Sequence, residues 1–278
     1  MKPNASKEAK AAFFWTTIAV IALAVYPALS IAAAPADRAQ VPSQPATPDP
    51  VPESLTAQGD ALYGERAVLA KAKEARAKYE AALAADEDAF EASWRLARVC
   101  YWIGDHTGAK DLKKTILLQG VEHAKKAVEL NPNRPEGHFW LGVCYGVYGE
   151  AKGVLKSLAL VKPIKESMRR VLAIDPAYDR GGADRVLGRV YHEVPGFAGG
   201  SEKQSLEHLL KAVEYGPRVG LNLIYLADTY ISLDRVDDAR KTLETILTME
   251  PLPDLLPETA EEREQARERL ERKPFKKK

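Results

Sequence analysis

The sequence predicts an all-α protein in which pairs of helices stack into a solenoid-like array. From about Leu55 to Pro251, apolar residues recur at three- and four-residue spacing, which is the period of an amphipathic helix. Short breaks containing Pro, Gly, Asn or Asp separate these segments and mark helix ends. No alternating run of β-branched residues predicts a strand. One short motif recurs four times along this stretch, as expected of a repeat architecture.

The recurring motif is Leu, then Ala or Gly, then two residues, then Tyr or Cys. The first and last positions lie one turn apart on one helix face, so both side chains fill the space between helices. The small residue lets a partner helix approach closely. The four copies are Leu96-Ala97-Cys100, Leu141-Gly142-Tyr145, Leu187-Gly188-Tyr191 and Leu226-Ala227-Tyr230.

Each motif helix is followed by a second helix and a turn that contains proline. This order resembles the tetratricopeptide repeat, whose period is about 34 residues. The last copy fits best, with Ala239 and Pro251 at the expected alanine and proline. Earlier copies are longer, and their extra residues, "TGAKDLKKTILLQ" and "EAKGVLKSLALVK", predict inserted helices. Residues 55–86 are a candidate degenerate first repeat.

The predicted repeat domain spans residues 55–251, and residues 252–278 predict a charged capping helix with a basic tail. Residues 37–54 are rich in proline and predict an extended linker. Residues 1–36 combine three lysines with an uncharged apolar run from Ala11 to about Ala36, which is typical of a cleaved signal peptide or an uncleaved N-terminal membrane anchor. We therefore expect an exported protein, either soluble or tethered to the inner membrane by residues 11–34.

A narrower resemblance rests on Leu-Gly, Pro-Ile-Lys, Ile-Asp-Pro and Pro-Gly-x-x-Gly-Gly elements within roughly residues 90–250. In these the chain is similar to the T component of TRAP-type (tripartite ATP-independent periplasmic) transport systems. The resemblance implies a periplasmic accessory protein. It also implies a protein partner, namely a periplasmic solute-binding protein, and a cavity for a small organic acid or an apolar ligand. The chain lacks the lipid-attachment cysteine of some relatives.

Charge and motif spacing exclude several classes of site. The chain has 40 basic and 39 acidic residues, so no charge excess predicts nucleic-acid binding. Cys100 and Cys144 lack a CxxC spacing and are either two buried thiols or one disulfide bridge. The histidines form no H-E-x-x-H pair, and no G-x-S-x-G nucleophile motif occurs. The sequence therefore predicts no catalytic residues, no metal site and no cofactor.

The glycine-rich stretch "EVPGFAGGSEKQ" raises the question of a phosphate loop, since helix N-termini after glycines bind anions. Its spacing matches neither a dinucleotide loop nor a P-loop. Ser201 and Gln204 have the spacing of a capping box, in which side chains bind the free N–H groups of a helix start. We therefore interpret the stretch as the turn between two helices of one repeat.

A binding surface is expected on the concave side, which the first helices of stacked pairs line. The residues two positions before and two positions after each motif Leu should point to this side, and so should the residue one helical turn further along. Aromatic and arginine side chains suit a peptide, or a ligand with an apolar body and a carboxylate. The alternative is that the aromatic residues belong to the core and the arginines to solvent. The predicted set is Trp94, Arg98, Tyr101, Phe139, Val143, Arg185, Arg189, His192, Ile224 and Asp228.

Two functions follow. The first is a non-enzymatic accessory protein of TRAP-type transport. The second is a general tetratricopeptide scaffold of the cell envelope that binds peptides or assembly subunits. The sequence leaves open whether the chain forms a homo-oligomer.

Overall fold

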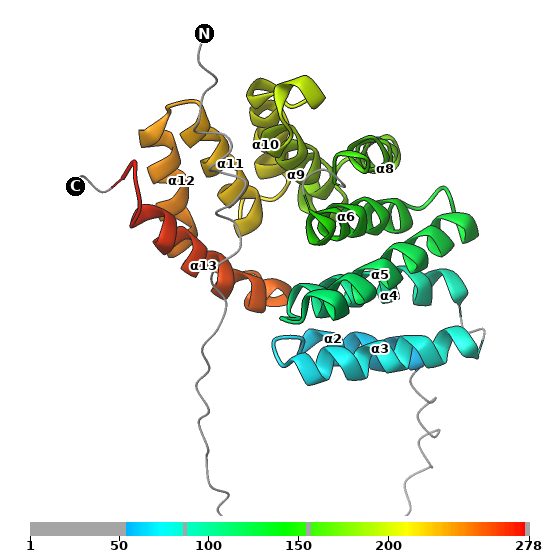
Figure 1. Ribbon diagram of the computed structural model, residues 1–278. Helices are drawn as coiled ribbons and strands as arrows, with labels where there is room; N and C mark the ends of the chain where they lie inside the picture. The colour runs from blue at the N-terminus through cyan, green and yellow to red at the C-terminus, as the bar shows by residue number, and fades with distance from the viewer. Residues whose placement is uncertain (1–53, 86–87, 154–156, 276–278) are drawn as a thin grey trace, which may run out of the picture. The chain divides into compact units, whose positions relative to one another are not determined.

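The computed structural model describes residues 54–85, 88–153 and 157–275, all within the unit Glu53–Lys278. The predicted N-terminal segment, nearly all of the linker and the last three residues lie outside the described residues. All regular structure in the described ranges is helical, which confirms the predicted fold class (Figure 1). None of these helices combines the length and apolar character that crossing a membrane requires.

Consecutive helices pack in pairs, and each pair packs on the next. The pairs are α2–α3, α4–α5, α6–α8, α9–α10 and α11–α12, and contacts such as α3–α4, α5–α6 and α10–α11 join them. This stacked array is the arrangement that the repeated motif predicts. The helices are α2 (Leu55–Gly64), α3 (Leu69–Ala84), α4 (Ala89–Asp105), α5 (Lys110–Leu130), α6 (Pro135–Lys152), α8 (Val161–Ile174), α9 (Tyr178–Glu193), α10 (Glu202–Tyr215), α11 (Gly220–Ser232), α12 (Val236–Thr248) and α13 (Leu256–Leu270), with the 3-10 helices η1 (Gly196–Ala198) and η2 (Pro253–Leu255).

The four motif copies lie in α4, α6, α9 and α11, each the first helix of its pair. The candidate degenerate repeat is the pair α2–α3. The first stretch of extra residues opens α5, which runs for 21 residues, and so lengthens the second helix of its pair. The second stretch joins α6 to α8, and residues 154–156 within it lie outside the described part of the chain.

Two motif glycines lie where the first and second helices of a pair touch. A Cβ added at Gly188 would lie 2.5 Å from Leu209 Cγ, and one added at Gly142 would lie 2.2 Å from Met168 Cε. Packed atoms do not approach so closely, so the contact of α9 with α10 favours glycine at position 188, whereas at position 142 the flexible end of Met168 would have to move aside.

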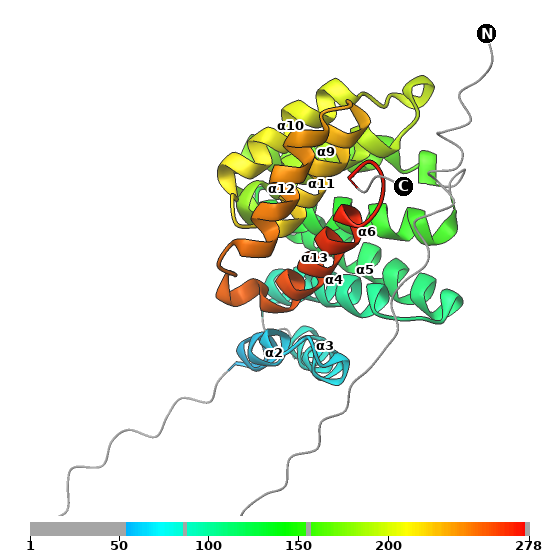
Figure 2. The same cartoon turned by 90° about the vertical axis from the view of Figure 1, so that its left-hand side faces the viewer.

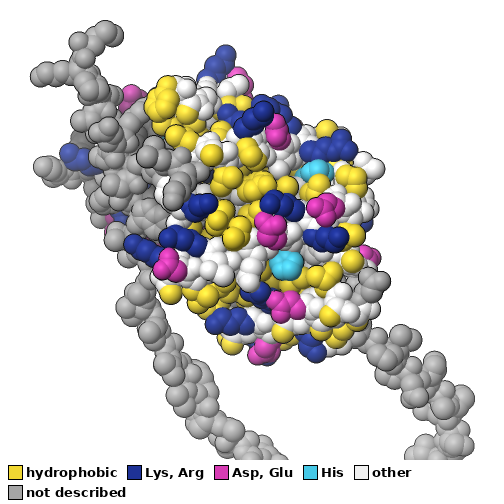
Figure 3. Space-filling view, turned by 45° about the vertical axis from the view of Figure 1, so that its right-hand side comes forward, with side chains coloured by type: hydrophobic (Ala, Val, Ile, Leu, Met, Phe, Trp, Pro, Cys, Tyr) yellow, Lys and Arg dark blue, Asp and Glu magenta, His cyan; other side chains and the backbone are white. Residues whose placement is uncertain are grey.

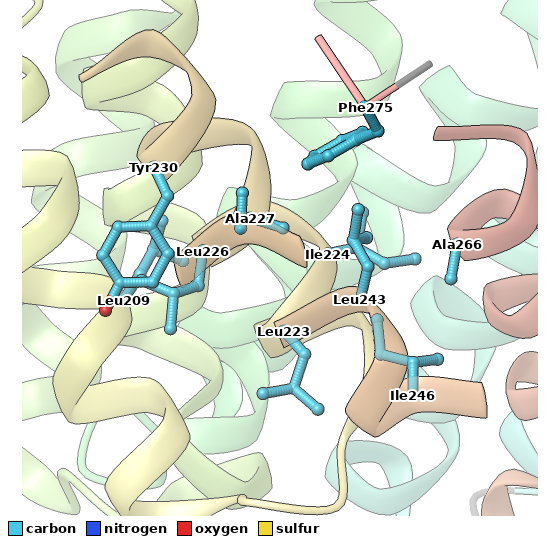
Figure 4. Close-up of a cluster of buried hydrophobic side chains, with 11 residues drawn as sticks. Leu209, Leu223, Ile224, Leu226, Ala227, Tyr230, Leu243, Ile246, Ala266 and Phe275 are labelled. Carbon is cyan, nitrogen blue, oxygen red and sulfur yellow. The ribbon is translucent and has the colours of Figure 1, made fainter. Parts of the chain in front are cut away.

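Buried apolar side chains form clusters between successive pairs. Figure 4 shows one of them, in which Leu209 meets the side chains of α11 and α12 while Ala266 of α13 closes the far side. Leu141, Tyr145 and Pro251 are half-buried. The motif residues that are buried are Leu96, Ala97, Cys100, Gly142, Leu187, Gly188, Tyr191, Leu226, Ala227, Tyr230 and Ala239.

The glycine-rich connection between α9 and α10 is a turn closed on its own backbone. The Ser201 hydroxyl caps α10 by accepting the Gln204 N–H at 3.3 Å. The Ser201 N–H is donated to Tyr191 O at 2.9 Å, so the backbone takes the place of the second capping-box bond. A Cβ added at Gly200 would lie 1.6 Å from Val194 O, which requires glycine there. The backbone N–H groups of residues 198–201 and of Gln204 are therefore used within the turn.

Candidate binding pocket

A pocket of about 420 Å³ opens on the side of the array formed by the first helices. Its walls come from α2, α4, α6, the start of α9, and the segment of η2 and α13. Figures 1 and 2 show that α13 begins, in orange, near α2 and α4 and runs back, toward red, alongside α11 and α12, so its first turn and the segment before it supply the last wall. The lining residues are Asp60, Tyr63, Gly64, Arg66, Trp94, Arg98, Trp140, Tyr178, Asp179, Arg180, Pro253, Asp254, Leu255 and Glu258.

Arg98 on α4 lies between two aromatic rings of the pocket. Its Cζ is 4.0 Å from the ring centroid of Tyr63 and 4.9 Å from that of Trp94. Its Nη2 donates to Asp60 Oδ1 at 2.8 Å and to the Tyr79 hydroxyl at 3.1 Å. Its Nε is buried and has no hydrogen-bond partner within the described part of the chain. Burial opposes the charge of this guanidinium, but Tyr63, Tyr79 and Asp60 more than offset it, and the pKa of Arg98 is raised.

Arg66, between α2 and α3, connects the pocket to the C-terminal segment. Its Nε and Nη2 donate to Glu258 Oε1 and Oε2 at 2.9 and 2.5 Å, and Nη2 also donates to Asp254 O at 2.6 Å. The guanidinium lies over the rings of Tyr63 and Trp102, with its Cζ 4.9 and 5.3 Å from their centroids. A planar guanidinium suits such bidentate contact with a carboxylate.

The start of α9 brings Asp179 and Arg180 into the pocket on an irregular turn. Asp179, Arg180 and Gly181 have left-handed φ angles of 50°, 54° and 79°, a conformation that costs a non-glycine residue about 1–2 kcal/mol. A Cβ added at Gly181 would lie 2.7 Å from Ala212 Cα, so close packing on α10 requires glycine at the end of this turn. The turn directs Arg180 Nη2 to the Asp254 carboxylate at 3.0 Å.

Of the ten predicted surface residues, the structure places Trp94 and Arg98 in the pocket. Three others form bonds within the fold. Arg189 Nη1 and Arg269 Nε of α13 donate to Asp228 at 3.0 and 2.8 Å, and Arg185 Nη1 donates to Asn222 Oδ1 at 3.0 Å. Burial would raise the pKa of Asp228, but Arg269 and Arg189 outweigh it and the pKa is lowered. These polar groups tie α9, α11 and α13 together.

The prediction that Phe139 and Ile224 face the concave surface is wrong. Their exposed fractions are 2% and 0%, because the first helices are enclosed by their own partner helix and by the next pair. Tyr101 and Val143 are half-buried at the edges of core clusters. The ring of His192 bonds a glutamate at the start of α10 at 2.9 Å. Most of the predicted set is therefore structural.

Sequence reasoning missed most of the pocket. Asp60, Tyr63 and Arg66 lie in the degenerate first repeat, which carries no copy of the motif. Trp140 directly precedes the motif leucine of α6, but its position did not fit the expected spacing. Glu258 is one of many charged residues in the C-terminal stretch. It pairs with Arg66, which is far away in the sequence, so no local sequence pattern indicates the pair.

The surface in Figure 3 shows basic and acidic side chains interspersed with scattered hydrophobic ones. This face therefore offers no field of one sign that would steer a charged partner. The arginines of the pocket are a different case, because they converge on one cavity.

Comparison with known proteins identifies the family. The sequence profile of RMD1-3, regulator of microtubule dynamics protein 1-3, matches residues 55–194. Regulator of microtubule dynamics protein 1 of Bos taurus is 25% identical over 198 residues, which cover 65% of this chain and 60% of that protein. Protein 3 of Rattus norvegicus is 26% identical over 166 residues, which cover 54% of this chain and 35% of that protein. The chain thus spans less than two thirds of the length of these relatives.

A solved structure supports the fold. A thermophilic tetratricopeptide repeat protein of Thermus thermophilus superposes with a TM-score of 0.58 at 20% identity, covering 78% of this chain and 98% of that one. The tetratricopeptide-like fold is therefore confirmed, and folds of this class generally mediate contacts between proteins.

The same matches overturn the predicted transport role. The resemblance to the T component of TRAP systems is wrong, and so are the periplasmic location, the signal peptide and the solute-binding partner that went with it, because the curated relatives are regulators of microtubule dynamics. The alternative of a cell-envelope scaffold is wrong for the same reason. The profile match covers half of the chain, so the chain belongs to the regulator of microtubule dynamics protein 1-3 family.

Proposed function

We propose that this chain takes part in regulating microtubule dynamics by binding a protein partner in the pocket between its first helices. Membership of the family supports a role in microtubule dynamics. The repeat fold supports a role in contacts between proteins. The observation that carries the proposal is the environment of Arg98. This side chain is stacked between Tyr63 and Trp94, and its Nε is buried without a hydrogen-bond partner in the described residues.

The lining has the residue types that dominate binding energy at protein interfaces, which are Trp, Tyr and Arg. The volume of about 420 Å³ lies in the range of known ligand pockets, roughly 300–1,000 Å³. It accommodates one or two side chains of a partner. The free Nε of Arg98 would donate to a carboxylate or carbonyl oxygen that the partner brings, so a side-chain acid of a protein takes the place of the small organic acid expected from sequence.

The proposed role is non-enzymatic and uses no cofactor. The pocket lining contains no Ser, Cys or His that could serve as a nucleophile or base. Its carboxylates are bound to arginines: Asp60 to Arg98, Asp179 to Arg185, Asp254 to Arg180 and Glu258 to Arg66. Such groups suit recognition better than proton transfer.

The test measures the growth and shrinkage rates of single microtubules by fluorescence microscopy in the presence of the purified chain. We expect the unmodified chain to change at least one of these rates. Arg98→Met and Trp94→Ala should weaken the effect, raising the concentration that gives half of it by about tenfold or more, as truncation of interface hot spots does.

The matched control is Arg218→Ala, which also removes one positive charge, from a side chain that is half exposed and lies 4.0 Å from the carboxylate of Glu250. It should keep the full effect. Circular dichroism melting shows whether each variant is folded. The proposal is wrong if the unmodified chain leaves every rate unchanged. It is also wrong if Arg218→Ala weakens the effect on these rates as much as Arg98→Met does.

A further inference from the structure

The C-terminal strap, residues 252–258, places acidic groups on two pocket arginines. Glu258 binds Arg66 through both carboxylate oxygens. The Asp254 carboxylate accepts from Arg180 Nη2 at 3.0 and 3.1 Å, and the Asp254 carbonyl accepts from Arg66 Nη2 at 2.6 Å. Both arginines thus already hold an acidic segment, one that belongs to the chain itself.

The strap is held differently from the rest of the C-terminal helix. Further along α13, Ala266 is fully buried in the core and Arg269 bonds Asp228 of α11. In the strap, the side chain of Asp254 is 58% exposed and Leu256 is 55% exposed. Ion pairs therefore hold the strap, which includes the first turn of α13, whereas core packing holds the helix from the buried Thr259 onward. The strap can thus leave the pocket while the rest of α13 stays in place.

Departure of the strap reverses the charge balance of the pocket. The lining contains three arginines and four carboxylates, and two of those carboxylates, Asp254 and Glu258, belong to the strap. Without them the arginines outnumber the acids. Asp60 and Asp179 remain paired with arginines of α4 and α9, and the buried Nε of Arg98 is one more donor.

We propose that the strap is a built-in occupant of the pocket and that the partner binds by an acidic peptide segment, whose carboxylates replace those of Asp254 and Glu258 on Arg180 and Arg66. Because these two acids are four positions apart, the segment carries at least two acidic side chains within about one helical turn or its extended equivalent. This inference rests on the proposed function, since it names the chemistry of the partner in that same pocket.

The test is fluorescence anisotropy of a labelled decapeptide of alternating Glu and Gly, titrated with the full chain. The double variant Asp254→Asn/Glu258→Gln weakens the internal occupant, and we expect it to bind the peptide at least about tenfold more tightly than the unmodified chain does. Adding Arg66→Met and Arg180→Met to the double variant should abolish this gain. A matched Gln–Gly decapeptide should bind to none of these proteins.

The control is Glu264→Gln/Glu268→Gln, which removes the same charge from α13 outside the pocket lining, where the two glutamates pair with Arg267 and Arg272. It should bind the acidic peptide no more tightly than the unmodified chain does. Equal gains in this control and in the strap variant would overturn the proposal, because the effect would then be one of net charge.

Hydrogen exchange gives a second readout on the unmodified chain. Saturating acidic peptide should reduce the protection of amides in residues 252–258 and leave those of residues 263–270 unchanged. Peptide binding without a change in the strap would overturn the proposal.

Neither assay contains microtubules, so the two proposals fail separately. Peptide exchange with no effect on microtubules contradicts only the proposed function. Effects on microtubules with no peptide exchange contradict only the inference about the strap.

Discussion

The guanidinium of Arg66 binds the carboxylate of Glu258 through two hydrogen bonds, with Nε–Oε1 at 2.9 Å and Nη2–Oε2 at 2.5 Å. The residues are 192 positions apart, and the contact joins the segment after α2 to the first turn of α13. Arg66 is only 5% exposed, whereas the Glu258 side chain is 27% exposed. This pair therefore closes the C-terminal segment over the first helix pair.

We expect Glu258→Gln to lower the free energy of unfolding by about 1–3 kcal/mol, because it leaves a buried guanidinium without its charged partner. Arg66→Met removes the charge together with the bond. The double variant should lose less than the sum of the single variants, with a coupling energy of about 0.5–3 kcal/mol. Urea denaturation of the four proteins measures this coupling. Strictly additive losses would show that the pair contributes nothing of its own.

The motif glycine of α9 predicts a second effect on stability. Gly188→Ala should destabilise the protein by about 1–3 kcal/mol, since the new Cβ meets Leu209 and overpacks the contact. Gly146→Ala is the control, because a Cβ added there meets no atom within 4 Å. It should stabilise α6 by about 0.5–1 kcal/mol, as replacing a helical glycine by alanine does. The melting temperature should therefore fall for Gly188→Ala and rise for Gly146→Ala. A shift of both melting temperatures in the same direction would contradict the packing argument.

The helix pairs could be predicted because their determinants are local in sequence. Leu226, Ala227 and Tyr230 share one helix, and their spacing alone places them on one buried face. The period of the motif then gives the order of the pairs. The same reasoning identified the turn before α10, because Ser201 and the glycines around it act within a few residues.

The pocket could not be predicted in this way. Periodicity separates a buried face from an exposed one, but the first helices contact their own partner and the next pair, so Phe139 and Ile224 are buried on a face that spacing left open. The strap depends on bonds between Arg66 and Glu258 and between Arg180 and Asp254, and such distant pairs leave no signal in one sequence.

The resemblance to transport proteins was misleading for a physical reason. The short sequence elements on which it rests are determined by helix packing and turn geometry, and helical repeat proteins of different function share these features. Gly188 is fixed by the contact with α10, and Gly200 by the carbonyl of Val194. Neither residue lines the pocket, so neither carries information about the partner.

The two cysteines, which the sequence left as thiols or a disulfide, are both free and buried in the structure. Burial raises the pKa of Cys100 to about 11 and raises that of Cys144 well above its usual value. Because the thiolate is the reactive form, neither should react with a disulfide reagent in the folded protein at about pH 8. Both should react at once in denaturant. Rapid labelling of the folded chain, followed by absorbance, would contradict this burial.

Glu262 on α13 is a buried acid pressed against the start of α11. It is 5% exposed, and a Cβ added at Gly220 would lie 2.2 Å from its Oε2. Burial raises the pKa of Glu262 to about 7, and Glu258 and Glu261 act in the same direction, while the backbone N–H of Leu221 and the charge of Arg185 oppose it. The position therefore favours the protonated carboxyl.

A raised pKa fixes the sign of the pH dependence. Between about pH 4.5, the value of a free glutamate, and about 7, the folded chain holds a proton that the unfolded chain has lost. The contribution of Glu262 is thus fully present below this window and falls as pH rises through it, by up to about 3 kcal/mol. Glu262→Gln should remove that decline from the free energy of unfolding measured in urea at several pH values, whereas Glu264→Gln on the exposed side of the same helix should retain it. Identical pH profiles for the two variants would show that Glu262 ionises normally in the folded protein.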